Sequence, residues 1–137
     1  MRSSRPILLV EDDQIDVMTI KRALKEIKVN NEIINARNGE EALAYLRDES
    51  KETPCLLLLD LNMPRMNGIE FLRAAREEKL LQNTPAVVLT TSKEDQDRTE
   101  TFKLCVAGYM IKPVDYAQFV EVVKTIDQYW TLSELPS

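Results

Sequence analysis

Four short apolar runs each end directly in polar side chains, and this repeated pattern constrains the fold more than any other feature. The runs and the polar residues that follow them are 7–10 with Glu11 and Asp12, 55–59 with Asp60, 86–89 with Thr90 and Thr91, and 108–111 with Lys112. Such runs are typical of strands buried on both faces of a parallel sheet. Because ligand sites in such sheets lie at the carboxyl ends of the strands, we expect these polar side chains to meet at one edge.

Amphipathic helical patterns separate the runs and complete a repeating strand–helix order. The predicted strands are residues 6–10, 32–36, 55–59, 85–89 and 108–111. Apolar residues at spacings of three and four define the inward faces of helices, and they are Val17, Ile20, Leu24 and Ile27; Ala42, Leu43 and Leu46; Ile69, Leu72 and Ala75; and Phe119, Val122, Val123 and Ile126. Five strand–helix units in 137 residues predict one α/β domain with three layers.

The segment 92–106 departs from this regularity. It is charged, and its apolar residues gather at its C-terminal end. Ser92, with Asp95 three residues later, is a candidate N-cap for a helix here, as Asp115 is for the last helix. We expect the helix within 92–106 to have low amphipathicity and to be loosely held.

Charge and composition exclude several classes of partner. The net charge of −5 argues against nucleic-acid binding, because phosphate backbones bind basic surfaces. No apolar run reaches the roughly 20 residues of a membrane span, and the N-terminus leads into a strand without a signal-peptide core. Cys55 and Cys105 are isolated in apolar surroundings, so we expect two buried free thiols. These features predict a cytoplasmic protein with no nucleic-acid and no membrane partner.

The sequence contains no histidine, which restricts its chemistry. Histidine-dependent catalytic triads, histidine-ligated metals and a phosphohistidine on this chain are excluded. A metal would have to bind oxygen ligands, which favours magnesium or calcium over zinc. The carboxylates of Glu11, Asp12 and Asp60, the hydroxyl of Thr90 and the ammonium of Lys112 form a set that can bind a divalent cation and a phosphoryl group together.

The strand-end residues occur in motifs that resemble those of a known family. From residue 7 to about residue 126, the chain resembles the receiver domain of two-component response regulators. The motifs that carry the resemblance are Val10-Glu11-Asp12, Asp60-Leu61-Asn62-Met63-Pro64, Leu89-Thr90-Thr91-Ser92 and Tyr109-Met110-Ile111-Lys112-Pro113. The resemblance implies a flavodoxin-like (βα)5 fold, doubly wound, with a parallel five-stranded sheet in the order 2-1-3-4-5.

The resemblance also implies roles for the acidic residues and the lysine. Asp60 matches the family's phosphoacceptor, a carboxylate that attacks phosphorus and forms an acyl phosphate. Asp12 directly, Glu11 through water, Asp60, and the backbone carbonyl of Asn62 match the ligands of Mg²⁺, for which Mn²⁺ or Ca²⁺ can substitute in crystals. Lys112 matches the lysine that binds the phosphoryl oxygens, and its bond to Pro113 is expected to be cis.

Two further residues match the family's switch residues, and a third, Thr91, stands where many family members have a smaller residue. Thr90 matches the hydroxyl that moves to bond the phosphoryl group, and Tyr109 matches the aromatic residue whose rotamer follows the threonine. Thr91 is expected to line the access to Asp60. Each of the three also fits the alternative of an ordinary strand or core residue.

The implied function is that of a phosphorylation-controlled switch. The protein would accept a phosphoryl group from a sensor histidine kinase onto Asp60, change its partner-binding surface, and catalyse only its own phosphorylation and dephosphorylation. The overall pattern, with an aromatic C-terminal tail at residues 128–137 and the motif Leu89-Thr90-Thr91-Ser92, is similar to that of single-domain regulators paired with bacterial phytochromes, especially cyanobacterial ones. The large apolar residues of this tail are Tyr129, Trp130, Leu132 and Leu135. This pattern predicts a single receiver domain with a core at about 6–127. It also favours a homodimer through the segment 92–106, the strand 108–111, the last helix and the tail.

Several alternatives remain open at this stage. Glu11, Asp12 and Asp13 could simply be acids at a helix start, which explains Asp13 and Asp16 better than Glu11 or Asp12. An enzyme of the haloacid-dehalogenase type uses similar groups, but it needs a second aspartate where this chain has Asn62. A receiver fold can also act only as a binding module, and the tail could fold back on its own domain.

Overall fold

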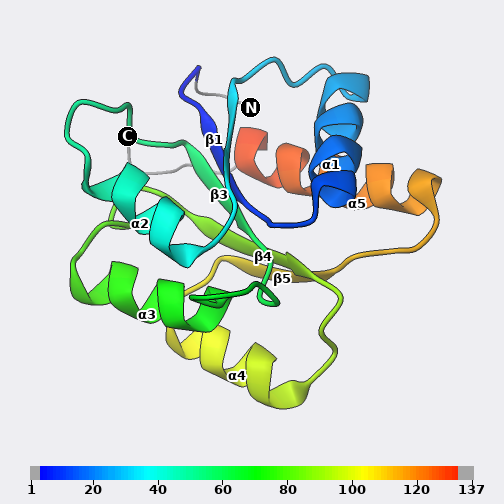
Figure 1. The fold of residues 1–137 in the computed structure, drawn as a ribbon. Coiled ribbons are helices and arrows are strands. Elements are labelled where there is room, and N and C mark those ends of the chain that lie inside the picture. Colours follow the sequence, from blue (N-terminus) through cyan, green and yellow to red (C-terminus); the bar gives the residue numbers. More distant parts are fainter. Residues whose placement is uncertain (1–3, 133–137) are drawn as a thin grey trace.

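Strands and helices alternate strictly along the chain (Figure 1). The computed structural model describes residues 4–132, with side chains to residue 129. The elements are β1 (Ile7–Val10), α1 (Gln14–Glu26), β2 (Ile33–Ala36), α2 (Gly39–Arg47), β3 (Leu56–Leu59), α3 (Gly68–Glu77), β4 (Ala86–Thr90), α4 (Asp95–Lys103), β5 (Gly108–Ile111) and α5 (Tyr116–Leu132).

The five strands form one parallel sheet in the order β2-β1-β3-β4-β5. Helices α1 and α5 cover one face of the sheet, and α2, α3 and α4 cover the other (Figure 1). Alternate strand residues feed separate cores: Ile7 and Leu9 pack in the core shared with α1 and α5, and Leu8 and Val10 pack in the core shared with α2 and α3. The fold class predicted from the sequence is therefore confirmed.

Strand boundaries differ from the predicted ones by one residue in most cases. Strands β1, β2, β3 and β4 each begin one residue later than expected, and β4 extends by one residue to Thr90. Proline explains two of these shifts, because Pro6 and Pro85 have no backbone N–H to donate to the sheet.

Helix α4 has the weakest apolar face, as the sequence predicts. Thr101 is its only buried residue, and Phe102 is half exposed. Polar contacts hold the end of this helix: the Arg76 guanidinium of α3 donates from Nε to the Leu104 carbonyl at 2.8 Å and from Nη2 to the Cys105 carbonyl at 2.9 Å.

The predicted N-cap of α4 is wrong. The helix begins at Asp95, and its N-cap position is Glu94, whose side chain makes no capping hydrogen bond. The Ser92 hydroxyl lies one turn earlier and donates to Asp97 Oδ2 at 2.6 Å, so it ties the preceding loop to the helix. The predicted cap of α5 is confirmed, because Asp115 Oδ1 accepts from the backbone N–H groups of Ala117 and Gln118.

The two cysteines are free thiols, but only one of them is buried. Cys55 lies in the core beside β3, and burial raises the pKa of its thiol. Cys105 is exposed, contrary to the prediction. It takes a left-handed backbone conformation with φ 64° in the turn after α4.

Helix α5 continues into the segment predicted to be a tail. Phe119, Val123 and Ile126 are buried, whereas Tyr129 is 56% exposed. The side chains of Trp130 and Leu132, and all of residues 133–137 including Leu135, lie outside the described part. No helix in residues 4–132 has the length and apolar character of a membrane span.

Candidate functional site

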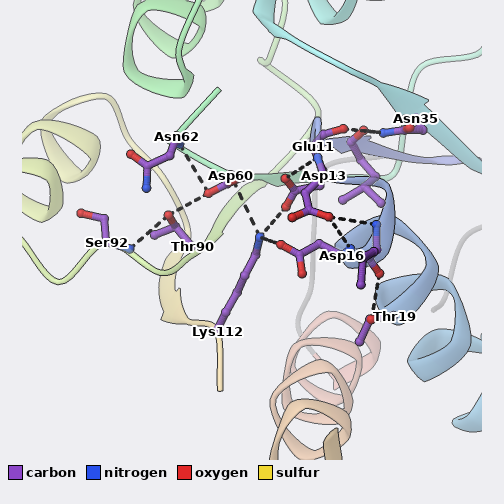
Figure 2. A network of polar contacts seen from close by, with 12 residues as sticks. Glu11, Asp13, Asp16, Thr19, Asn35, Asp60, Asn62, Thr90, Ser92 and Lys112 are labelled. Carbon is purple, nitrogen blue, oxygen red and sulfur yellow. Dashed lines mark hydrogen bonds and ion pairs between the residues drawn. The ribbon is translucent and has the colours of Figure 1, made fainter. Parts of the chain in front are cut away.

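The carboxyl ends of four neighbouring strands bring the predicted polar residues together (Figure 2). Val10 is paired with Leu59 and Thr90 with Ile111, so the residues that follow these strands lie side by side. Backbone hydrogen bonds extend the sheet into the site, from Asp60 N to Val10 O at 3.0 Å and from Lys112 N to Thr90 O at 2.8 Å. The convergence predicted from the sequence is therefore confirmed.

Asp60 is the buried carboxylate at the centre of the site, 8% exposed. Its Oδ1 accepts from the Thr90 hydroxyl at 2.8 Å and from the backbone N–H of Asn62 at 3.4 Å. Its Oδ2 lies 3.8 Å from Lys112 Nζ, which is an ion-pair distance but not a hydrogen bond. Two oxygens of one carboxylate thus have different surroundings, one hydrogen-bonded and one facing a cation.

Lys112 is almost fully buried among carboxylates. Its side chain is 6% exposed, and Nζ donates to Glu11 Oε1 and to Asp16 Oδ2, the latter at 2.9 Å. Burial alone lowers the pKa of this ammonium, but its hydrogen bonds to Glu11 and Asp16 and the negative charge of Asp60 outweigh burial and raise the pKa above its usual value. Lys112 therefore stays charged.

Glu11 is 1% exposed, and its carboxylate forms an ion pair with the ammonium of Lys112. Burial raises the pKa of its carboxyl to about 7, against the opposing effect of the Lys112 ammonium and with a further contribution from the nearby Asp60. Its Oε2 also accepts from the backbone N–H of Asp13 at 3.2 Å. Burial and the Lys112 ammonium thus act in opposite directions on the pKa of Glu11.

Three carboxylates of the site can share one metal ion. Oxygens of Glu11, Asp12 and Asp60 lie within 4.8 Å of one another, and Asp12 is exposed between the two buried acids. A donor set of oxygen alone fits a hard divalent cation such as Mg²⁺, Mn²⁺ or Ca²⁺. The expected contribution of the Asn62 carbonyl stays a prediction.

The start of α3 packs directly behind Asp60. A Cβ at Gly68 would lie 2.7 Å from the Asp60 carbonyl oxygen and 2.8 Å from Leu61 Cα, and Gly68 N donates to the Leu61 carbonyl at 3.1 Å. Asn67 caps the helix with Glu70 in a reciprocal capping box. The loop that carries Asp60 and Asn62 is therefore fixed to a helix end by backbone contact.

A hydrogen-bond chain leads from Asp60 towards α4. The buried Thr90 hydroxyl, which donates to Asp60, accepts from Ser92 N at 3.3 Å, and the Tyr109 hydroxyl donates to the Ser92 carbonyl at 3.0 Å. Arg98 of α4 lies over the Tyr109 ring, 5.5 Å from its centroid. The two predicted switch residues are thus linked through Ser92, which connects them to α4.

Two further predictions concern the Lys112–Pro113 peptide bond and the position of Thr91. No peptide bond in residues 4–132 is cis, so the expectation for Lys112–Pro113 is wrong; the bond takes the trans form that even proline favours intrinsically. Thr91 is exposed and lines a surface hollow of about 370 Å³ together with Lys112 and Pro113.

Asp16 is the site residue that the sequence interpretation missed. The pattern suggested only an acid at a helix start, which describes Asp13 well: its Oδ1 accepts from Ile15 N at 2.9 Å and from Asp16 N at 3.2 Å. Asp16 instead contacts Lys112 across the site. The only sequence signal for Asp16 is its position three residues after the cap Asp13, which places it in the first turn of α1 but does not indicate its contact with Lys112.

Comparison with known sequences agrees with this arrangement. The family model described as response regulator receiver domain matches residues 7–124. Response regulator Rcp1 of Synechocystis sp. is 34% identical over 128 residues, which cover 90% of this chain and 87% of Rcp1. The probable methanogenesis regulatory protein FilR2 of Methanothrix harundinacea is 36% identical over 127 residues, covering 90% of this chain and 82% of FilR2.

Solved structures show the same similarity over nearly the whole chain. The phosphorylated cyanobacterial phytochrome response regulator RcpA superposes with a TM-score of 0.88 at 37% identity, covering 96% of this chain and 98% of RcpA. The Mn²⁺-bound form of Rcp1 superposes with a TM-score of 0.86 at 34% identity, covering 96% and 98%.

Proposed function

Because this chain belongs to the response regulator receiver family, we propose that it takes a phosphoryl group from the phosphohistidine of a sensor histidine kinase onto Asp60. The observation that carries the assignment is the placement of this one carboxylate. Asp60 is buried at the end of β3, with the Thr90 hydroxyl on one oxygen and Lys112 Nζ 3.8 Å from the other. No other carboxylate in the described residues has both neighbours.

The transfer is a displacement at phosphorus. A carboxylate oxygen of Asp60 forms the new bond to phosphorus, and the bond to the imidazole nitrogen of the kinase breaks, leaving its electron pair on the nitrogen. Lys112 offers a fixed positive charge and Thr90 a hydroxyl to the phosphoryl oxygens, so this chain contributes chiefly position and charge. It catalyses only its own phosphorylation and dephosphorylation.

Glu11, Asp12 and Asp60 would hold the divalent cation that this transfer needs, which we assign as Mg²⁺. When bound, the cation supplies positive charge that offsets both the mutual repulsion of the carboxylates and the negative charge of the phosphoryl group. The oxygen ligands and the exposed side chain of Asp12 leave room for the waters that Mg²⁺ retains.

Phosphorylation of Asp60→Asn tests the assignment. The variant should fold like the wild type because the shape is kept, yet take up no phosphoryl group from a small phosphodonor with magnesium, as measured by intact mass. Asp115→Asn is the matched control, because asparagine still caps α5 and the residue lies outside the site. A normal mass gain in Asp60→Asn would refute Asp60 as the acceptor.

The signal is proposed to leave the site through Thr90, Ser92 and Tyr109 towards α4, β5 and α5. A phosphoryl group on Asp60 would draw the Thr90 hydroxyl from its present 2.8 Å contact with Asp60. That hydroxyl also accepts from Ser92 N, so its movement reaches the loop before α4. Since α4 contributes one buried residue, a small change in free energy can shift it.

The same surface is the proposed homodimer interface, together with the C-terminal tail. Phe102 on α4 and Tyr129 on α5 are 51% and 56% exposed, and exposed large apolar side chains often mark contacts. Sedimentation of the full chain and of a chain ending at Gln128 tests the dimer, and a full-length monomer in both phosphorylation states would refute it.

We assign the upstream kinase as a phytochrome, by similarity to RcpA.

A further inference from the structure

The carboxylate of Asp16 holds Lys112 more closely than Asp60 does. Its Oδ2 lies 2.9 Å from Lys112 Nζ, whereas Asp60 Oδ2 lies 3.8 Å from the same atom (Figure 2). Asp16 is not one of the three carboxylates that can share a metal ion. It is therefore a ligand of the ammonium alone.

Asp16 projects from a well-fixed position. It lies in the first turn of α1, whose start is capped by Asp13, and the adjacent Val17 is buried in the core beneath the sheet. The side chain of Asp16 is 35% exposed, but Lys112, its partner, is only 6% exposed. The contact thus joins the start of α1 to the end of β5 inside the site.

Glu11, in contrast, has two possible cations to bind. It contacts Lys112 Nζ, and it belongs to the carboxylate cluster with Asp12 and Asp60. An ammonium has three N–H donors, and Glu11 and Asp16 engage two of them. If Glu11 turns to a divalent cation, Asp16 is the carboxylate that still holds Lys112 at hydrogen-bond distance.

We propose that Asp16 is a positioning residue that keeps Lys112 beside Asp60 while Glu11, Asp12 and Asp60 hold a divalent cation. The role rests on the proposed function of the site. Without Asp16, the buried ammonium would remain on Glu11 and compete with the cation. With Asp16 present, the ammonium is held by Asp16 and the cation by the three other carboxylates, so both positive charges can lie beside a phosphoryl group on Asp60.

Manganese binding tests the proposal without any phosphoryl transfer. Mn²⁺ is titrated into the full-length protein, and free Mn²⁺ is measured by electron paramagnetic resonance. Asp16→Asn should bind Mn²⁺ at least about fivefold more weakly than the wild type. Asp13→Asn is the matched control, because it removes one carboxylate from the same helix start, keeps the cap and has no contact with Lys112; it should change the affinity by less than about twofold.

Replacing Lys112 shows whether the effect passes through the ammonium. In a Lys112→Met background, Asp16→Asn should change the Mn²⁺ affinity by less than about twofold, since no ammonium competes. Equal losses with and without Lys112, or equal affinities of Asp16→Asn and Asp13→Asn, would overturn the proposal. Circular dichroism of each variant confirms that it is folded.

Phosphorylation provides a separate measurement. With saturating Mg²⁺ and a small phosphodonor, Asp16→Asn should be phosphorylated roughly tenfold more slowly than Asp13→Asn, because Lys112 has lost its anchor. Failure of the wild type to accept phosphate would overturn the proposed function but not the Mn²⁺ result. If the wild type accepts phosphate but Asp16→Asn matches Asp13→Asn in either the phosphorylation rate or the Mn²⁺ affinity, the role of Asp16 alone is overturned.

Discussion

Replacing Lys112 by methionine should destabilise the protein in a pH-dependent way. In the described residues, Lys112 is the only cation in contact with Glu11, Asp16 and Asp60, and both it and Glu11 are almost fully buried. Removing one partner of a buried ion pair typically costs about 3–5 kcal/mol. Because the Asp16 side chain is 35% exposed and therefore partly solvated, we expect the lower end of this range, about 3 kcal/mol at about pH 8.

The pH dependence follows from Glu11. Burial raises the pKa of Glu11 from an ordinary 4.5 to about 7, so the folded state holds this proton more tightly than the unfolded state. The contribution of Glu11 to stability is greatest below the unfolded pKa and declines as the pH rises through the folded pKa. Because Lys112 lowers the pKa of Glu11, that pKa should rise further in Lys112→Met, and the stability contributed by Glu11 should decline at a higher pH than in the wild type. At about pH 5.5 Glu11 is protonated and neutral, so it no longer needs the charge of Lys112. The loss of stability in Lys112→Met should therefore be roughly half of its value at about pH 8.

Urea unfolding at the two pH values measures these differences, with Lys124→Met as the control because Lys124 is exposed on α5. The control should change the free energy of unfolding by less than about 0.5 kcal/mol. Saturating magnesium should restore part of the loss in Lys112→Met, since the cation replaces the ammonium among the carboxylates. A loss of equal size at both pH values, unaffected by magnesium, would refute the electrostatic role and leave only packing.

Three further predictions test other parts of the structure. Gly68→Ala should lower the free energy of unfolding by about 2 kcal/mol, because the added Cβ would meet the backbone behind Asp60. Gly108→Ala should lower it by less than about 1 kcal/mol, because the nearest atom to its added Cβ is 3.8 Å away. Urea unfolding measures both, and equal costs would contradict the packing argument. Thr90→Ala should still accept phosphate but lose the difference in kinase or partner affinity between phosphorylated and unphosphorylated forms, measured by calorimetry; a retained difference contradicts the path through Thr90. A thiol reagent should label the exposed Cys105 rapidly and Cys55 only on unfolding, as followed by mass; fast labelling of both would contradict the burial of Cys55.

The sheet and the central residues of the site were predictable because each depends on local sequence. Buried parallel strands appear as continuous apolar runs, and their ends necessarily share one edge of the sheet, which placed Asp60, Thr90 and Lys112 together. The partner of Asp16 was not predictable in this way. The direction of a side chain on the first turn of α1 relative to β5 is set by how the helix packs, which the sequence pattern does not contain.

The incorrect expectations have the same origin. Ser92 has the right residue type for a cap, but α4 begins only at Asp95, so the Ser92 oxygen accepts from Glu94 N at 3.4 Å in the preceding loop and its hydroxyl donates to Asp97. Cys105 is flanked by apolar residues in the sequence, but it lies exposed in a left-handed turn after α4. Both outcomes depend on contacts between side chains or on one backbone dihedral angle, which apolar patterning does not specify.

The weak apolar face of α4 has a consequence for how regulators of this kind can diverge. Residues Asp95–Lys103 contribute one buried side chain, and the end of the helix is held by Arg76 through backbone carbonyls rather than through particular side chains of α4. Most of the helix surface can therefore be exchanged without disturbing the hydrophobic core. After gene duplication, two copies could acquire different partners by substitutions in this helix while keeping the same chemistry at Asp60. A chimera carrying the α4 surface of another regulator is the corresponding route to redirecting a signalling pathway by design.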